Sequence, residues 1–175
     1  MKYLYVCMLC VLLFSCCANK KMVVEQNKQE SIWHCPKDGT CAFEIFNQKT
    51  LNILKDDFGA LYQEINEGDK MVLKFEYKRH EIPNTVDGHY SEQILMELNP
   101  DNLDLELENV EFKNIKLLFA RFCYCKGQTG YYPVKQGKLS ISKLSKDKFK
   151  LNLNFKVDEV PQIITEIEHE FILVK

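Results

Sequence analysis

Apolar and polar residues alternate along most of the chain after residue 32. The clearest run lies at 149–157, where Phe, Leu and Val positions alternate with Lys, Asn and Asp positions. Because successive side chains of a strand point to opposite faces, this period of two predicts half-buried strands. The same period recurs at residues 71–77, 94–98 and 103–107. Turn-forming residues separate the runs at 66–69, 87–88, 136–137 and 145–148.

Several such strands separated by turns predict an all-β fold, an antiparallel sandwich or barrel of about 8 to 10 strands. Residues 139–144 and 149–157 are expected to form a hairpin. The run at 115–125 is apolar on both faces, which predicts a central strand or one that crosses between sheets. The C-terminal run at 161–174 fits either a strand or a short helix, and its β-branched residues favour a strand.

The N-terminus has the layout of an export signal. Lys2 precedes an uncharged apolar run at 4–14, which is too short for a permanent membrane helix. The run ends in Leu13-Phe14-Ser15-Cys16, which resembles the lipobox of bacterial lipoproteins. The resemblance implies a signal peptide at 1–15 and a lipidated N-terminus with a flexible tether at 16–31. A single β-rich domain at 32–175 completes the expected organisation.

The lipoprotein resemblance also implies a location. Cys16 would carry a diacylglyceryl group, and two or more acyl chains give a stable membrane anchor. In this family an Asp after the acylated Cys retains the protein at the inner membrane. Cys17 occupies that place, which favours the outer membrane. Lys20 and Lys21 stand where surface-exposed lipoproteins carry an acidic cluster, so the periplasmic face is favoured and the cell surface is the alternative.

Charge and motifs limit the function classes. The 175 residues carry 23 Lys and Arg against 25 Asp and Glu, a net charge of −2, so we expect no nucleic-acid partner. No phosphate-loop, dinucleotide, nucleophile-elbow or zinc-protease motif is present, and we expect no cofactor and no catalytic site. The four histidines are scattered. His169 shares the apolar face of its strand, which favours a hydrogen-bonded core residue over a catalytic one.

Four cysteines of the domain, Cys35, Cys41, Cys123 and Cys125, are disulfide candidates. Their spacing is unusual for zinc, and an oxidising compartment favours disulfides over a metal site. On a continuous strand, the Cα atoms of residues 123 and 125 would lie about 6.6–6.8 Å apart, at the outer limit for a bond between them. We therefore expect a neighbouring segment to present Cys35 and Cys41 to them. The pairs would be 35–123 with 41–125, or the crossed alternative.

Two further segments are candidate binding surfaces. Gln128, Tyr131 and Tyr132 lie in a Gly-containing segment after the two-sided strand, and exposed aromatic loops are common recognition elements. The alternative is a connecting turn whose tyrosines fold back onto the core. Residues 135–156 are rich in lysine, which predicts a solvated face, with attraction to anionic lipid headgroups as the alternative.

Together these features favour a membrane-anchored, non-enzymatic envelope module that binds a protein or glycan partner or has a structural role. The main alternative is a lipocalin-like carrier, because a β-barrel of about eight strands can enclose one small hydrophobic molecule. In that case Phe119 and Phe122 would line the cavity. A hydrolase that uses His169 is a third, less favoured hypothesis, since no paired nucleophile or metal motif accompanies it.

Overall fold

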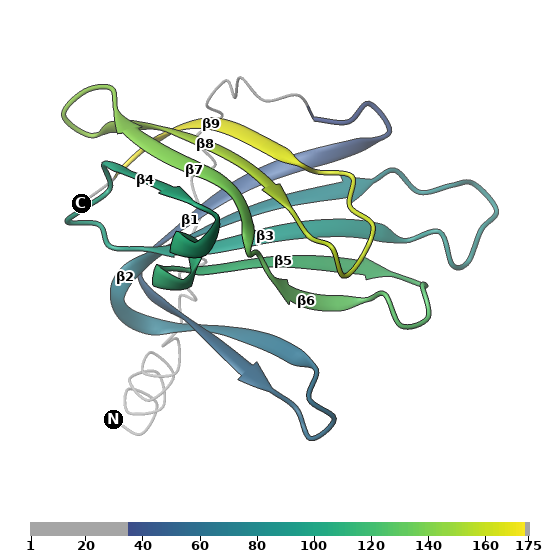
Figure 1. Ribbon diagram of the computed structural model, residues 1–175. Helices are drawn as coiled ribbons and strands as arrows, with labels where there is room; N and C mark the ends of the chain where they lie inside the picture. The colour runs from purple at the N-terminus through teal and green to yellow at the C-terminus, as the bar shows by residue number, and fades with distance from the viewer. Residues whose placement is uncertain (1–34, 174–175) are drawn as a thin grey trace, which may run out of the picture.

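The computed structural model describes residues 35–173, which form nine strands in two antiparallel sheets (Figure 1). Sheet A has the strand order β1-β2-β3-β5-β6, and sheet B has the order β4-β7-β8-β9. The strands are β1 (Gly39–Lys55), β2 (Leu61–Arg79), β3 (Tyr90–Leu98), β4 (Leu105–Glu108), β5 (Lys116–Cys123), β6 (Gly130–Pro133), β7 (Gln136–Lys143), β8 (Lys148–Lys156) and β9 (Glu166–Ile172), with the 3₁₀ helix η2 (Asn109–Asn114) between β4 and β5. The two sheets enclose one core and do not close into a barrel, so the fold is the predicted β-sandwich.

Part of the sequence prediction lies outside the described residues: the signal peptide at 1–15, the lipidation site Cys16 and the tether at 16–31. Among residues 35–173, no helix is long and apolar enough to cross a membrane.

The core between the sheets is built from the alternating positions. Leu73, Met96 and Phe119 enter it from sheet A, and Leu153 and Phe171 enter it from sheet B. All five are at most 2% exposed, so the centre of the core is shielded from water. Strands β7 and β8 form the predicted hairpin. The C-terminal run, for which a strand or a helix was expected, forms the strand β9.

Strand β5 confirms the expectation for a two-sided apolar run. Phe119 belongs to the core between the sheets, whereas Leu118 points to the other face of sheet A. There it packs with Leu51, Val72 and Leu95, which are all fully buried. The second face of β5 is therefore covered as well, by the first hairpin of the chain.

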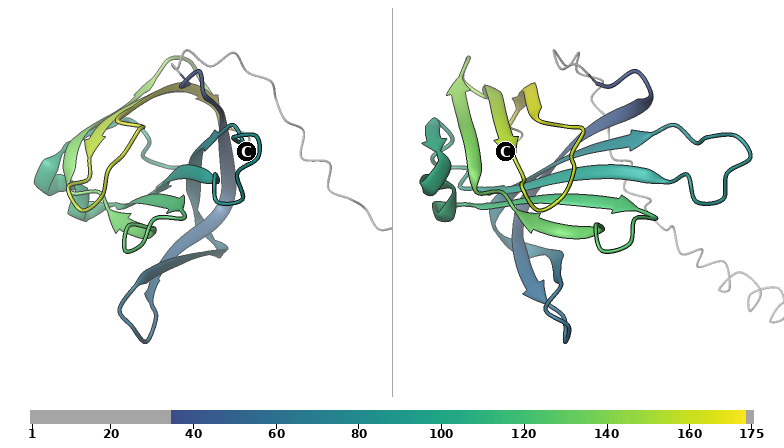
Figure 2. Two further views of the ribbon diagram at one scale, coloured as in Figure 1. Left: turned by 90° about the vertical axis from the view of Figure 1, so that its right-hand side faces the viewer. Right: turned by 45° about the vertical axis from the view of Figure 1, so that its right-hand side comes forward.

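This first hairpin bends. Strands β1 and β2 pair from Gly39↔Arg79 to Lys55↔Leu61, with a shift of register between Asn47 and Lys49. Gln48 has a positive φ of 54°, which is unusual for a residue with a side chain. Beyond this bulge, residues 49–67 leave the sandwich as a two-stranded projection, here called the arm (Figures 1 and 2). A bulge in one strand bends a ribbon in this way.

The base of the arm is fixed by Glu97 of β3. Its Oε2 accepts hydrogen bonds from the backbone N–H of Leu51 at 2.7 Å, the hydroxyl of Thr50 at 3.1 Å and the ammonium of Lys116 at 2.9 Å. Sequence analysis placed a turn at residues 66–69, and this prediction is wrong. Those residues lie inside β2 at the bend, and the turn of the hairpin is at 56–60.

The cysteine pairing is also corrected. The structure joins Cys35 to Cys41 and Cys123 to Cys125, with Cα–Cα distances of 5.8 and 5.2 Å. The expected distance for residues 123 and 125 assumed a continuous strand, but β5 ends at Cys123 and the chain bends at Tyr124. The other assumption fails as well. Because β2 and β3 separate β1 from β5, two residues on those strands lie about 14 Å apart, twice the Cα limit for a disulfide.

Candidate functional site

A polar network occupies the end of the sandwich where β2 and β5 finish and β3 begins. Glu92 of β3 points toward the core and is completely buried. Its carboxylate accepts hydrogen bonds from the backbone N–H groups of Ile163 and Ile164 at 2.6 and 2.7 Å and from the hydroxyl of Tyr90 at 2.5 Å. Arg121, 8% exposed, donates through Nε to the Tyr90 hydroxyl at 3.3 Å.

Tyr90 is the centre of this network. Burial raises its pKa to about 12, and the hydrogen bond to Glu92 adds to the shift, so the phenol stays protonated at neutral pH. The Arg79 guanidinium lies 4.5 Å from the centre of its ring. The hydrogen bonds of this network join β3, β5 and the loop before β9 at this end of the sandwich.

The three predicted binding-loop residues join this end of the molecule in different ways. The Gln128 side-chain oxygen accepts a hydrogen bond from Arg121 at 2.9 Å. Tyr131 and Tyr132 lie on strand β6, not on a loop, and both are half-buried. Tyr131 contacts Phe122 edge-on at 5.4 Å beside the second apolar cluster, and Tyr132 packs against the main core. The structure thus places the rings as the folded-back alternative describes.

His169 lies on the inward face of β9, as predicted. It is 7% exposed, and its ring packs against Phe43 at a tilted angle, with 4.0 Å between centroids. Burial lowers its pKa to about 4, with a small opposing effect from Glu170. The imidazole is therefore neutral at pH 7 and poorly suited to act as a general acid. Within residues 35–173, no group of three His, Cys, Asp or Glu side chains could hold a metal ion.

The lysines of the 135–156 region are largely paired. Lys148 and Lys150 contact Glu170 and Glu168 on β9, and Lys138 contacts Glu106 and Glu108 on β4. Cross-strand carboxylates therefore offset much of the positive charge that the sequence places on this face.

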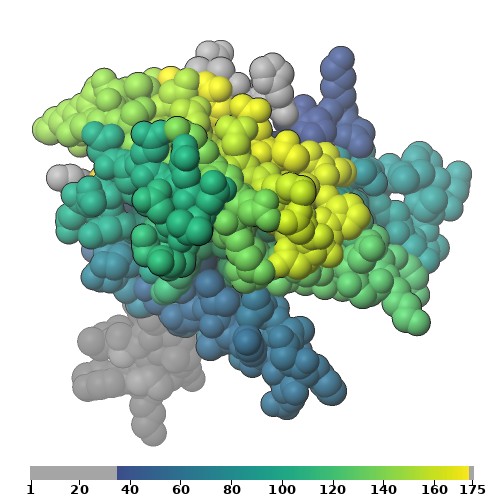
Figure 3. Space-filling model, viewed as in Figure 1, coloured from purple at the N-terminus to yellow at the C-terminus, as the bar shows by residue number. Residues whose placement is uncertain are grey.

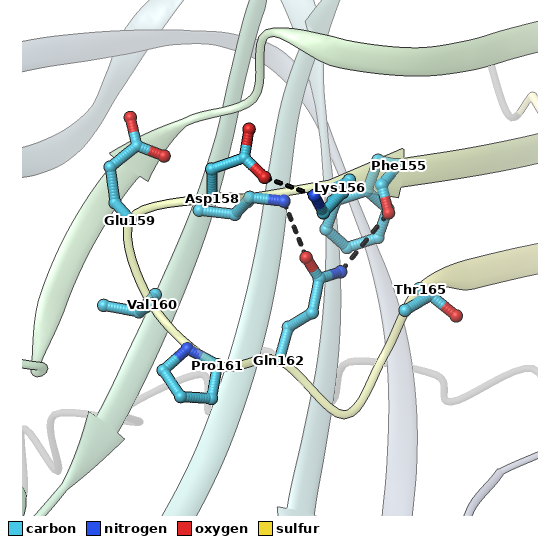
Figure 4. Close-up of a pocket in the computed structure, with 9 residues that line it drawn as sticks. Phe155, Lys156, Asp158, Glu159, Val160, Pro161, Gln162 and Thr165 are labelled. Atoms are coloured by element: carbon cyan, nitrogen blue, oxygen red, sulfur yellow. Dashed lines mark hydrogen bonds and ion pairs between the residues drawn. The ribbon is translucent and has the colours of Figure 1, made fainter.

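One hollow on the described surface, of about 680 Å³, lies inside the loop between β8 and β9. Figure 4 shows that Gln162 spans it. Its side-chain oxygen accepts from the N–H of Val157 at 2.6 Å, and its nitrogen donates to the carbonyls of Phe155 and Ile164 at 3.3 and 2.7 Å. Since the amide holds the loop's own backbone, this hollow is part of the loop's structure.

A second hollow, of about 560 Å³, has a different character. It runs between the arm, η2 and the neighbouring ends of β5 and β6. Its lining contains the apolar residues Ile53, Val110, Phe112, Ile115, Leu117, Leu118, Pro133 and Val134, together with Asn109 and three lysines, Lys113, Lys116 and Lys135. No carboxylate is among these lining residues. We call this hollow the lysine-rimmed groove.

Local structure explains how the groove keeps apolar side chains in contact with water. Helix η2 is closed at its start by reciprocal hydrogen bonds between Glu108 and Glu111, a capping box. This fixes the start of a short 3₁₀ helix in which Phe112 enters the core and Val110 points outward, 76% exposed. Ile53 approaches from the arm, which Glu97 holds in place.

The three lysines of the groove differ in their ion pairing. Lys116 is paired with Glu97 and Lys135 with Glu159, at 2.9 and 2.7 Å. Lys113 makes no ion pair within the part of the chain that the structure describes. An exposed apolar floor with cations above it is suited to a partner that brings an apolar group and negative charge together.

Sequence reasoning missed this groove, because its residues come from three separate segments of the chain and no motif links them. The one local signal was Val110, an apolar residue between two polar ones just after a strand. Comparison of the chain with protein-family profiles, with curated protein sequences and with solved structures found no match.

Proposed function

We propose that this protein is a lipid-anchored, non-enzymatic binding module of the bacterial cell envelope, and that the lysine-rimmed groove is its binding site. The observation that carries the second part is the composition of the groove, an apolar floor with three lysines and no carboxylate among its lining residues. The anchor rests on the lipobox-like Leu13-Phe14-Ser15-Cys16.

The two disulfides support a location outside the cytoplasm. Cys35–Cys41 and Cys123–Cys125 would be reduced in most cytosolic environments, and disulfides persist in the periplasm and at cell surfaces. A filled core and satisfied polar groups at one end of the sandwich suit a rigid scaffold, and rigid scaffolds lower the entropy cost of binding.

A carrier of a small hydrophobic ligand remains the second candidate, but its site would have to change. The expected cavity between Phe119 and Phe122 does not fit the fold, because Phe119 lies in the filled core and Phe122 packs against Tyr131 on β6. The apolar floor of the groove is the feature that favours a carrier, and an amphiphile with a negative head would match the lysines.

The anchor is tested by Cys16→Ser in the full chain. We expect the variant to leave the membrane fraction and to keep its β-rich circular dichroism spectrum, because the core lies within residues 35–173. Cys17→Ser is the matched control and should stay with the membrane. Retention of Cys16→Ser in membranes after a high-salt wash would contradict the lipoprotein proposal.

The groove is tested with anilinonaphthalene sulfonate, an aromatic anion that fluoresces in apolar surroundings. We expect saturable binding to the folded protein, about tenfold weaker binding in Val110→Asp, which places a charge on the floor, and weaker binding in Lys113→Glu. Val86→Asp changes an equally apolar residue that is 89% exposed on the β2–β3 loop, and it should bind like the unchanged protein. Equal binding by all four proteins would refute the groove as the binding site.

A further inference from the structure

The tip of the arm displays an aromatic side chain that no residue of the described part of the chain covers. Phe58 is 96% exposed, the most exposed large apolar residue of the described chain. In Figures 2 and 3 the hairpin tip stands away from the body of the sandwich. A large ring so fully in water is costly in a monomer and is typical of a recognition element.

The tip is also rigid. Asp56 Oδ1 accepts hydrogen bonds from the backbone N–H groups of Phe58 and Ala60 at 2.9 and 2.8 Å, and the Asp56 N–H donates to the Ala60 carbonyl at 2.9 Å. Gly59 takes the positive φ of 84° that the turn requires. Phe58 is therefore held in place before it meets a partner, which lowers the entropy cost of inserting it.

The charge at the tip is complementary to the groove. Asp56 and Asp57 precede Phe58, and neither forms an ion pair with another described residue. The groove carries the opposite charge, because Lys113, Lys116 and Lys135 line it together with apolar residues. An aromatic ring beside two carboxylates is the chemistry that such a groove would select.

From these observations we propose that the lysine-rimmed groove of one molecule receives the arm tip, residues 56–60, of a second copy of this chain. The proposal rests on the groove being the binding site, as proposed above. The tip cannot reach the groove of its own molecule, because the same arm lines the groove through Ile53 and then projects away from it.

The geometry of this contact makes it a head-to-tail interaction. The tip and the groove are different surfaces, and no residue of 56–60 lines the groove, so each molecule could give its tip to one neighbour and accept the tip of another. Such heterologous contacts build rings or open chains. One ring and a few charges make a weak contact in solution. Copies anchored in the same membrane are held at a high effective concentration, which favours this contact.

The test uses the full lipidated chain in cell envelopes, with the photo-reactive amino acid p-benzoylphenylalanine at position 58 and two differently tagged copies. We expect irradiation to join the two tags, and mass spectrometry to map the adduct to groove residues such as Val110 and Pro133. The same photo-reactive residue at Val86, an exposed apolar position on another loop, is the matched control and should give no joined tags.

Charge reversal sharpens the test. Asp57→Lys on the tip and Lys113→Glu on the groove should each reduce the yield of joined tags about fivefold. The two changes together should restore it, because the pair is then reversed but again complementary. Failure of the double variant to recover would contradict a direct tip-to-groove contact.

Other adducts separate this proposal from the one on which it rests. If the position-58 probe joins another protein or a lipid and no second copy, the self-association is refuted. The proposal that the groove is the binding site is still supported in that case if Val110→Asp weakens binding of the fluorescent anion. If the anion binding is also insensitive to Val110→Asp, both proposals fail.

Discussion

At the scale of single residues, the alternation of side chains along a strand decides which of them face the core and which can contact a partner. Tyr131 and Tyr132 are neighbours in sequence, yet on β6 they face opposite sides, one toward the outer apolar cluster and one toward the core. Val110 and Phe58 are exposed because each sits in a tight turn fixed by a carboxylate, Glu111 in η2 and Asp56 in the arm. The two tyrosines predicted as a binding surface are thus half-buried on a strand, whereas Val110 and Phe58 are exposed between strands.

His169 provides a prediction at this scale. Burial lowers its pKa from 6.5 to about 4, so between these values the unfolded chain binds a proton that the folded chain excludes. Stability should therefore fall as the pH drops from about 6.5 to 4, by about 3 kcal/mol for this residue alone. His169→Phe keeps an aromatic ring against Phe43 and does not titrate, so its stability should fall less over this range.

Urea unfolding of both proteins at several pH values measures this difference, since the titration of the remaining carboxyl groups cancels between them. Two parallel stability curves would show that the imidazole makes no such contribution.

At the scale of elements, the alternating pattern was sufficient for the strands and insufficient for the bends. It predicted the β7–β8 hairpin, the strand at the C-terminus and the two-sided strand β5. In each of them the apolar residues of the sequence mark the positions that are buried. It failed for the arm, where Gln48 of β1 and residues 68–70 of β2 form a bulge and the strand β2 continues through residues typical of turns. The pairing of Cys123 with Cys125 was missed for the same reason, a bend at Tyr124.

The disulfides give a prediction for these elements. Both close short loops, with sequence separations of 6 and 2, so the chain-entropy model gives about 2 kcal/mol for the first and about 1 kcal/mol for the second. A loop of more than about 80 residues would give a value above about 4 kcal/mol. The double variants Cys35→Ser/Cys41→Ser and Cys123→Ser/Cys125→Ser should each stay folded and lose about 2 and about 1 kcal/mol of unfolding free energy, respectively. Peptide mapping without reduction is expected to find both short-range pairs. A peptide joining Cys35 or Cys41 to Cys123 or Cys125 would contradict the structure.

At the scale of the whole molecule, the sandwich has two distinct ends. One end is closed by the disulfides and by the polar network around Tyr90, and the lysine-rimmed groove lies beside η2. The groove could not be predicted from the sequence, since Ile53 and Lys113 line the same hollow only because a bulge bends the arm. Glu92 was more accessible to sequence reasoning, because it occupies the apolar register of Ile94 and Met96, where a carboxylate is unusual.

Glu92 joins sheet A to the loop that leads into β9 of sheet B, and this gives a prediction for the assembly of the two layers. Its carboxylate serves two backbone N–H groups and the Tyr90 hydroxyl in a fully buried place. Glu92→Gln replaces one acceptor oxygen with a donor, so at least one of these buried donors loses its partner. We expect a loss of about 2 to 3 kcal/mol of unfolding free energy, measured by urea denaturation, and faster hydrogen exchange at Ile163 and Ile164. Glu44→Gln, which changes an exposed carboxylate on β1, should cost within about 0.5 kcal/mol. Equal stability of the two variants would mean that Glu92 does not hold the layers together.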